Sequence, residues 1–231
     1  MLVISLGGSI LVPDTPATDL IAAYRDLLAE YCAVDGRRCI VIVGGGAPAR
    51  RYQGAYRQLC KTGGTEPESA AQDWIGIMAT RLNAELFRHA LGTLCRDPVV
   101  TDPSADLSFS GQVLVGAGWK PGFSTDFDAV LLAERYKADT VVNLSNIDRV
   151  FTADPALDPE AQPLETVSWA DFLAIVGSDW KPGSNLPFDP VATRRAAEAG
   201  LRVIAANGRN LENTRAILAN RPFVGTSIGP G

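Results

Sequence analysis

The chain has 231 residues, of which 46% are hydrophobic and 20% charged, and its formal net charge at pH 7 is −5. This composition is typical of a soluble globular protein, and the acidic balance argues against a general nucleic-acid binder. The four cysteines form no CxxC pattern and there is one histidine, so we expect no zinc site and reduced cysteines in a cytoplasmic protein.

The apolar residues 1–6 are followed at once by two glycines and carry no basic leader, so we do not interpret them as a signal peptide. No apolar run is long enough to span a bilayer, and we expect no membrane partner.

Segments with strand and helix patterns alternate along the chain. Strands are predicted over 2–6, 39–43, 98–100, 112–116, 140–144, 202–206 and 223–226. Helices are predicted over 18–33, 47–60, 71–92, 126–137, 168–175, 190–199 and 210–219, and loops over 61–70 and 145–165. Apolar strands separated by helices indicate an α/β fold, a three-layer α/β/α sandwich with a mostly parallel central sheet. We expect a single domain over 1–231.

Two of the predicted strands run directly into glycines. The first ends in Gly7-Gly8-Ser9 and the second in Gly44-Gly45-Gly46, and a helical pattern follows each turn. Such turns leave backbone N–H groups bare at the positive end of a helix dipole, which suits phosphate. A single glycine pair is more often an ordinary tight turn. Two on neighbouring strands predict a site for two phosphorylated groups, and therefore phosphoryl transfer.

The second turn has a competing interpretation as a dinucleotide fingerprint, because Gly44-x-Gly46-x-x-Ala49 fits that pattern. The fingerprint needs an acidic residue at the end of a strand about 20 residues further on. Residues 61–70 are not a strand, so we reject this alternative. Arg50 follows the glycines by one helical turn and is either a phosphate ligand or part of a solvated face.

Polar residues at three further places are candidate ligands, each with a structural alternative. Asp73 either binds ribose hydroxyls or caps a helix. Ser124 and Thr125 either bind an anion or form a capping turn with Thr125 as N-cap, and Asp126 adds a carboxylate for lysines or Mg²⁺. Lys181 either meets a transferring phosphoryl group or is a solubilising charge.

The segment after the strand at 140–144 is the last candidate. Ser145 and Asn146 are placed to bind a base or ribose, Phe151 to cover a ring and Asp154 to bind a ribose hydroxyl, because parallel α/β folds bind ligands at the carboxyl ends of strands. The alternative is a polar loop.

Six segments in this order resemble the amino-acid kinase superfamily, and within it archaeal-type UMP kinases. They are ISLGGSILVP, VGGGAPARRY, DWIGIMATRLNAEL, PGFSTDFDAVLLAE, ADTVVNLSNIDRVFTADP and GTSI. The resemblance implies phosphorylation of UMP to UDP by ATP with Mg²⁺ in pyrimidine nucleotide biosynthesis, and a homohexamer. It also implies an acceptor-binding lobe mainly in 1–125 and an ATP-binding lobe mainly in 126–231.

Residue roles follow from the same resemblance. It implies ATP contacts at Gly8, Ser9, Gly46, Arg50, Ser145, Asn146, Phe151 and Asp154. It implies UMP contacts at Gly45, Asp73, Trp119, Lys120, Pro121, Gly122, Phe123, Ser124 and Thr125. Catalytic roles fall on Lys181, Asp126 and Arg50, and no protein-held metal site is expected.

Three positions depart from the family pattern. Ser5 stands where most members have a lysine, and Lys120 is our candidate to replace that lysine. Arg149 stands where a glycine is usual, and Trp119 adds bulk where the acceptor should bind. Two alternatives therefore stay open: a kinase of the same fold for another phosphate such as isopentenyl phosphate, and a protein of this fold that binds nucleotide or oxyanions without catalysis.

Overall fold

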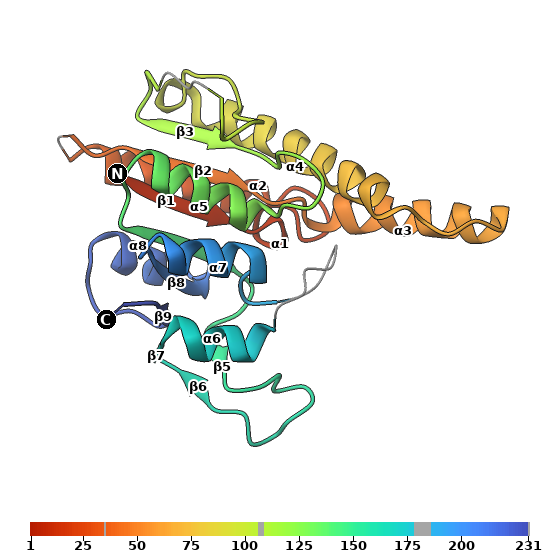
Figure 1. Cartoon of the computed structure of the whole chain (residues 1–231). Coiled ribbons are helices and arrows are strands. Elements are labelled where there is room, and N and C mark those ends of the chain that lie inside the picture. The colour runs from red at the N-terminus through yellow and green to blue at the C-terminus, as the bar shows by residue number, and fades with distance from the viewer. Residues whose placement is uncertain (35, 106–108, 178–185, 231) are drawn as a thin grey trace.

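A seven-stranded sheet forms the centre of the molecule, with helices on both faces (Figure 1). The computed structural model describes residues 1–34, 36–105, 109–177 and 186–230. The strand order is β3-β2-β1-β4-β8-β9-β7, and every pair is parallel except β8 with β9. These strands are β1 Leu2–Leu6, β2 Cys39–Val43, β3 Val113–Gly116, β4 Thr140–Ser145, β7 Thr166–Val167, β8 Arg202–Asn207 and β9 Thr226–Ile228. The predicted α/β sandwich with a mostly parallel sheet is confirmed.

Alternating residues of the strands feed two separate apolar cores. Ile4 and Leu6 of β1 face one core, and Val3 faces the other. The first core is covered by α1 Gly8–Leu11, α2 Thr18–Cys32, α4 Ser69–Leu91 and α8 Leu211–Leu218. The second is covered by α5 Thr125–Arg135, α6 Trp169–Val176 and α7 Pro190–Glu198. Strands buried on both faces explain their unbroken apolar sequences.

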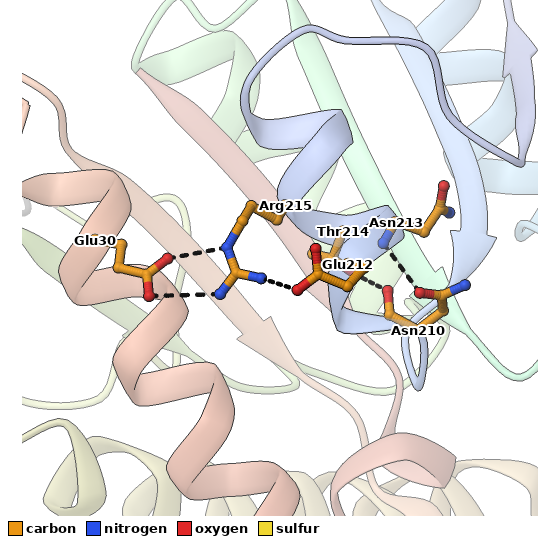
Figure 2. Close-up of polar contacts among 6 residues, drawn as sticks. All are labelled: Glu30, Asn210, Glu212, Asn213, Thr214 and Arg215. Carbon is orange, nitrogen blue, oxygen red and sulfur yellow. Dashed lines mark hydrogen bonds and ion pairs between the residues drawn. The ribbon is translucent and has the colours of Figure 1, made fainter.

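An exposed ion-pair network links α2 and α8 on the surface of the first layer (Figure 2). Arg215 of α8 donates from Nε to Oε2 of Glu30 on α2 over 3.0 Å and also pairs with Glu212. The side chain of Asn210 caps α8 by accepting the N–H of Asn213 over 3.0 Å. These contacts hold the start of α8 and its packing on α2.

Helices α3 Gly46–Gly63 and α4 pack against one another, and α3 reaches beyond the end of the sheet (Figure 1). Several sequence expectations for this region are wrong in detail. The helix predicted to end at residue 60 continues to Gly63, and α4 begins at Ser69 rather than 71. Asp73 therefore lies inside α4 and is not an N-cap.

Other elements of the structure differ locally from those predicted from the sequence. The strand predicted over 98–100 is only a bridge between Val100 and Gly116, and the chain continues through the 3-10 turn Gly92–Leu94 before it. The loop predicted over 145–165 contains a two-stranded hairpin, β5 Val150–Phe151 with β6 Pro163–Leu164. The predicted strand over 223–226 lies at 226–228. The N-cap of α5 is Ser124 rather than Thr125, because the Ser124 hydroxyl accepts the N–H of Phe127.

Candidate active site

A pocket of about 500 Å³ lies at the carboxyl ends of β1, β2 and β4. Its lining combines both glycine turns with the start of α3, one face of α4, the start of α5 and residues that follow β4. Twelve of the residues singled out in the sequence line it: Gly8, Ser9, Gly45, Gly46, Arg50, Asp73, Phe123, Ser124, Thr125, Asp126, Ser145 and Asn146. Segments between Ser5 and Pro187 therefore meet in one place.

The two glycine turns lie in direct backbone contact. Strands β1 and β2 pair in parallel with Leu6 opposite Val43, so the turns that follow are side by side, as the sequence predicted. A Cβ on Gly8 would lie 2.0 Å from the backbone nitrogen of Gly46, and Gly46 itself has a positive φ of 61°. Only glycine allows this approach. The result is a floor of backbone atoms that no side chain covers.

Arg50 lies at the pocket one turn into α3 and is exposed. In the described part of the chain it forms no ion pair with a carboxylate. Its guanidinium is thus available for an anion in the pocket.

Side chains of helix α4 form hydrogen bonds with the backbone of the turn between β3 and α5. The Oδ2 atom of Asp73 accepts the N–H of Gly122 over 2.8 Å, and the Thr80 hydroxyl oxygen accepts the N–H of Gly118 over 2.8 Å. Arg81 donates from Nη2 to the carbonyl oxygen of Trp119 over 3.0 Å. Burial raises the pKa of Asp73, and the Gly122 hydrogen bond opposes that shift. Asp73 thus lines the pocket and also stabilises the turn through its hydrogen bond with Gly122.

The aromatic residues of this turn stack beside the pocket. The ring centroids of Trp119 and Phe123 are 5.4 Å apart, and Phe127 stacks on Phe123 at 4.5 Å. The Lys120 ammonium lies 3.7 Å from the Trp119 ring centroid. Phe123 lines the pocket, whereas Trp119, Lys120, Pro121 and Gly122 are not among its lining residues. The bulk of Trp119 therefore lies against its neighbours and does not fill the pocket.

Asp126 joins three elements at the pocket floor. Its Oδ1 atom accepts the hydroxyl of Ser5 on β1 over 2.8 Å, and Oδ2 accepts the N–H of Asp189, which caps α7, over 3.3 Å. Burial raises the pKa of Asp126 to about 6, against the Ser5 hydrogen bond, which lowers it.

Asp128 also lies on α5, two residues after Asp126, and is only 1% exposed. Its Oδ2 atom accepts the N–H of Trp119 over 3.2 Å, while Oδ1 is buried with no hydrogen-bond partner among the described residues. Burial raises the pKa of Asp128 to about 8, so the carboxyl is mostly protonated at neutral pH.

The pocket is also lined by Ser145, the last residue of β4, by Asn146 directly after it, and by Leu186 and Pro187. Phe151 on β5 and Asp154 after it do not line the pocket, and the Asp154 Oδ1 atom accepts the N–H of Ala156 over 2.9 Å. Arg149 pairs with Glu165 over 3.0 Å. Lys181 lies outside the described residues. No group of three or more His, Cys, Asp or Glu residues arranged for a metal ion occurs where the structure is described.

Sequence reasoning missed some lining residues, such as Gln53, Thr80 and Asn143. Gln53 lies three residues after Arg50 and so shares its helix face, a signal that was available. Asn143 gave no local signal, because its role depends on a hydrogen bond of 2.7 Å from Nδ2 to the carbonyl oxygen of Pro187.

Comparison with known proteins agrees with this architecture. Residues 1–207 match the model of the amino acid kinase family. The uridylate kinase of Methanospirillum hungatei is 36% identical over 230 residues, covering 98% of this chain and 94% of the relative. The uridylate kinase of Methanothermobacter thermautotrophicus is 34% identical and is covered over 99% of both chains. The crystal structure of uridylate kinase from Archaeoglobus fulgidus superposes with a TM-score of 0.80 at 30% identity, over 99% of this chain and 100% of that one. In the part of this chain that the structure describes, no helix is both long and apolar enough to cross a membrane. The chain belongs to the amino acid kinase family.

Proposed function

We propose that this protein phosphorylates UMP to UDP with ATP as the phosphoryl donor, a step of pyrimidine nucleotide biosynthesis. The observation that carries the proposal is the pair of glycine turns in backbone contact on the floor of one pocket, which offers N–H groups to two phosphorylated ligands. The names of the relatives at 36% and 34% identity support the choice of UMP.

The two nucleotides are assigned to opposite sides of the pocket. UMP lies on Gly45, Asp73 and the turn Trp119–Thr125, with Asp73 on its ribose. ATP is assigned to Gly8, Ser9, Gly46, Arg50, Ser145 and Asn146, and its adenosine also to Phe151 and Asp154, which lie outside the pocket lining. The acceptor contacts all come from residues 1–125, whereas the ATP contacts come equally from residues 1–125 and from residues 126–231.

Transfer of the γ-phosphoryl group in line to the UMP phosphate needs positioning and charge neutralisation. The attacking phosphate oxygen is already ionised, so no general base is required. Arg50, Lys181 and the glycine N–H groups supply positive charge. Asp126, tied to both β1 and α7, orients the cationic groups around the phosphates.

Mg²⁺ fits this site through the phosphates rather than through a cage of protein ligands. Asp73 and Asp126 are the carboxylates that line the pocket where it is described, and Mg²⁺ commonly binds one or two carboxylates together with substrate phosphates. Asp126 is the residue that would hold it, and the ion would supply neutralisation of phosphate charge.

A homohexamer built from dimers is part of the proposal. An exposed apolar patch on α3 and α4 supports self-association: Tyr52, Trp74, Met78, Leu82 and Leu86 are between 42% and 71% exposed. A cytoplasmic location is proposed as well, because Cys32, Cys39, Cys60 and Cys95 are all free thiols.

A coupled ADP-release assay with ATP, Mg²⁺ and UMP, CMP, dUMP, AMP or isopentenyl phosphate tests the function. We expect strong release with UMP. Release with isopentenyl phosphate instead would assign a different kinase of this fold. ATP binding without release from any acceptor would indicate a non-catalytic nucleotide binder.

A further inference from the structure

The turn between β8 and α8, residues 207–210, lies at the same edge of the sheet as the glycine turns. The N–H of Gly208 donates to the carbonyl oxygen of Ser145 over 2.8 Å, and the Tyr24 hydroxyl donates to the carbonyl oxygen of Gly208 over 2.6 Å. A Cβ on Gly208 would lie 3.1 Å from atoms of both Ile10 and Leu144. The turn is therefore fixed against the end of β4 and against α1.

Arg209 extends from this turn to the first glycine turn. Its backbone N–H donates to Oδ1 of Asn207 over 2.9 Å, and Asn207 is held in turn by Asp148 over 2.9 Å. Its Nη2 atom donates to the carbonyl oxygen of Ser9 over 3.1 Å, although the two residues are 200 positions apart in the sequence. Ser9 lines the pocket and Arg209 is not among its described lining residues, so the guanidinium lies next to the first glycine turn, just outside the lining.

Most N–H donors of the Arg209 guanidinium have no hydrogen-bond acceptor among the described residues. It has five N–H donors, and the contact with Ser9 engages one nitrogen. Arg209 is exposed, and it has no carboxylate partner among the ion pairs of the described residues. An arginine fixed in this way, with free donors and an unneutralised charge, is suited to bind phosphate oxygens.

The pocket lining carries few positive charges to balance the negative charge of a polyphosphate. Among its described lining residues Arg50 is the cation, whereas Asp73 and Asp126 are both carboxylic acids. Ser5, which also lines the pocket, gives Asp126 a neutral hydroxyl partner and adds no positive charge. The lining is thus short of positive charge for a polyphosphate.

We propose that Arg209 binds the polyphosphate of the donor nucleotide from the β8–α8 turn. The identity of that nucleotide as ATP rests on the proposed function. Arg209 supplies an additional phosphate ligand beside Ser9.

The test measures equilibrium binding of adenosine, AMP, ADP and ATP to the full chain by calorimetry. The variants are Arg209→Ala, Arg209→Lys and, as a matched control, Arg221→Ala, which removes an exposed arginine beyond the other end of α8. We expect Arg209→Ala to weaken ATP binding by about tenfold and to leave adenosine binding unchanged. Arg209→Lys should recover part of the loss, and Arg221→Ala should match the wild type.

Equal losses for adenosine and ATP would overturn the proposal, because Arg209 would then act only as a clasp on the turn at Ser9. Unchanged ATP affinity in Arg209→Ala, or no ATP binding by the wild type, would overturn it as well. The acceptor panel tests the proposed function separately. A selective loss of ATP affinity with no acceptor turned over would support Arg209 and reject the kinase.

Discussion

Ser5 on β1 donates a hydrogen bond of 2.8 Å to Oδ1 of Asp126 on α5, which is 121 residues away in the sequence. Ser5 is 2% exposed, so this hydroxyl is a buried neutral partner for a buried carboxyl. A hydrogen bond that favours the ionised form lowers a pKa, and here it opposes the shift caused by burial.

Removing the Ser5 hydroxyl should move the ionisation of Asp126 to higher pH. We expect Ser5→Ala to lower kcat near pH 6 more than at pH 8 and to shift the acid limb of the kcat profile upward. Ser5→Thr retains the hydroxyl and is the matched control. If the acid limb of the kcat profile is the same in Ser5→Ala and in wild type, turnover does not depend on the ionisation of Asp126.

Asp128 should make the protein less stable as the pH rises. Its carboxyl has a pKa of about 8 in the folded state against an ordinary value of 3.8, so the folded state binds the proton more tightly than the unfolded state. The stability linked to this proton is fully present below pH 3.8 and is lost as pH rises toward about 8. Asp126 adds a smaller effect between 3.8 and about 6.

Urea unfolding at pH 5 and pH 8 measures this effect. Asp128→Asn cannot ionise, so the fall in the free energy of unfolding between the two pH values should be smaller than in wild type. The comparison uses the pH dependence and not the absolute stability, because the asparagine NH₂ group would lack a partner at the Oδ1 position. Parallel pH profiles would show that Asp128 is ionised in the folded protein.

Asp73→Asn should weaken UMP binding by about tenfold and ATP binding much less, because an amide replaces the carboxylate that is proposed to accept ribose hydroxyls. The asparagine oxygen can still accept the N–H of Gly122, so the turn is retained. The preference for UMP over dUMP should shrink in the variant. Weakened ATP binding alone would mean that the two nucleotide sites are exchanged.

Gly8→Ala should destabilise the protein by about 1–3 kcal/mol and reduce binding of both nucleotides, because a Cβ 2.0 Å from the Gly46 nitrogen forces the glycine turns apart. Gly54→Ala, inside α3 with only an ordinary contact to Arg57, is the control and should be neutral or stabilising. Thermal unfolding and calorimetry measure both effects. A Gly8→Ala variant with wild-type stability and binding would show that the turns can separate freely.

Leu82→Glu should lower the mass of the proposed oligomer, because it places a charge in the α3–α4 patch where Leu82 is 68% exposed. Light scattering after size-exclusion chromatography gives the mass. Leu157→Glu changes an equally apolar residue that is 84% exposed outside the patch and should leave the mass unchanged. An unchanged mass in Leu82→Glu would remove the patch from the interface.

Local sequence patterns predicted the elements that local physics controls. The strands 2–6 and 39–43 coincide with β1 and β2, because an apolar run of β-branched residues between turn signals has few other solutions. Boundaries set by capping were less accurate. Asp73 fits the pattern of an N-cap, yet α4 starts four residues earlier at Ser69, because any of several polar residues there can begin a helix.

The sequence by itself determined the alternation of strands and helices, the two glycine turns and twelve of the residues that line the pocket. The tertiary structure decided that the turns touch through their backbones, that Trp119 stacks outside the pocket lining, that Ser5 binds Asp126 and that Arg209 reaches Ser9. Apart from the stacking of Trp119 on the nearby Phe123, those contacts join residues far apart in the chain, and they follow from the order of strands in the sheet. Strand order is settled by burial of both faces of the whole sheet, which short segments do not encode.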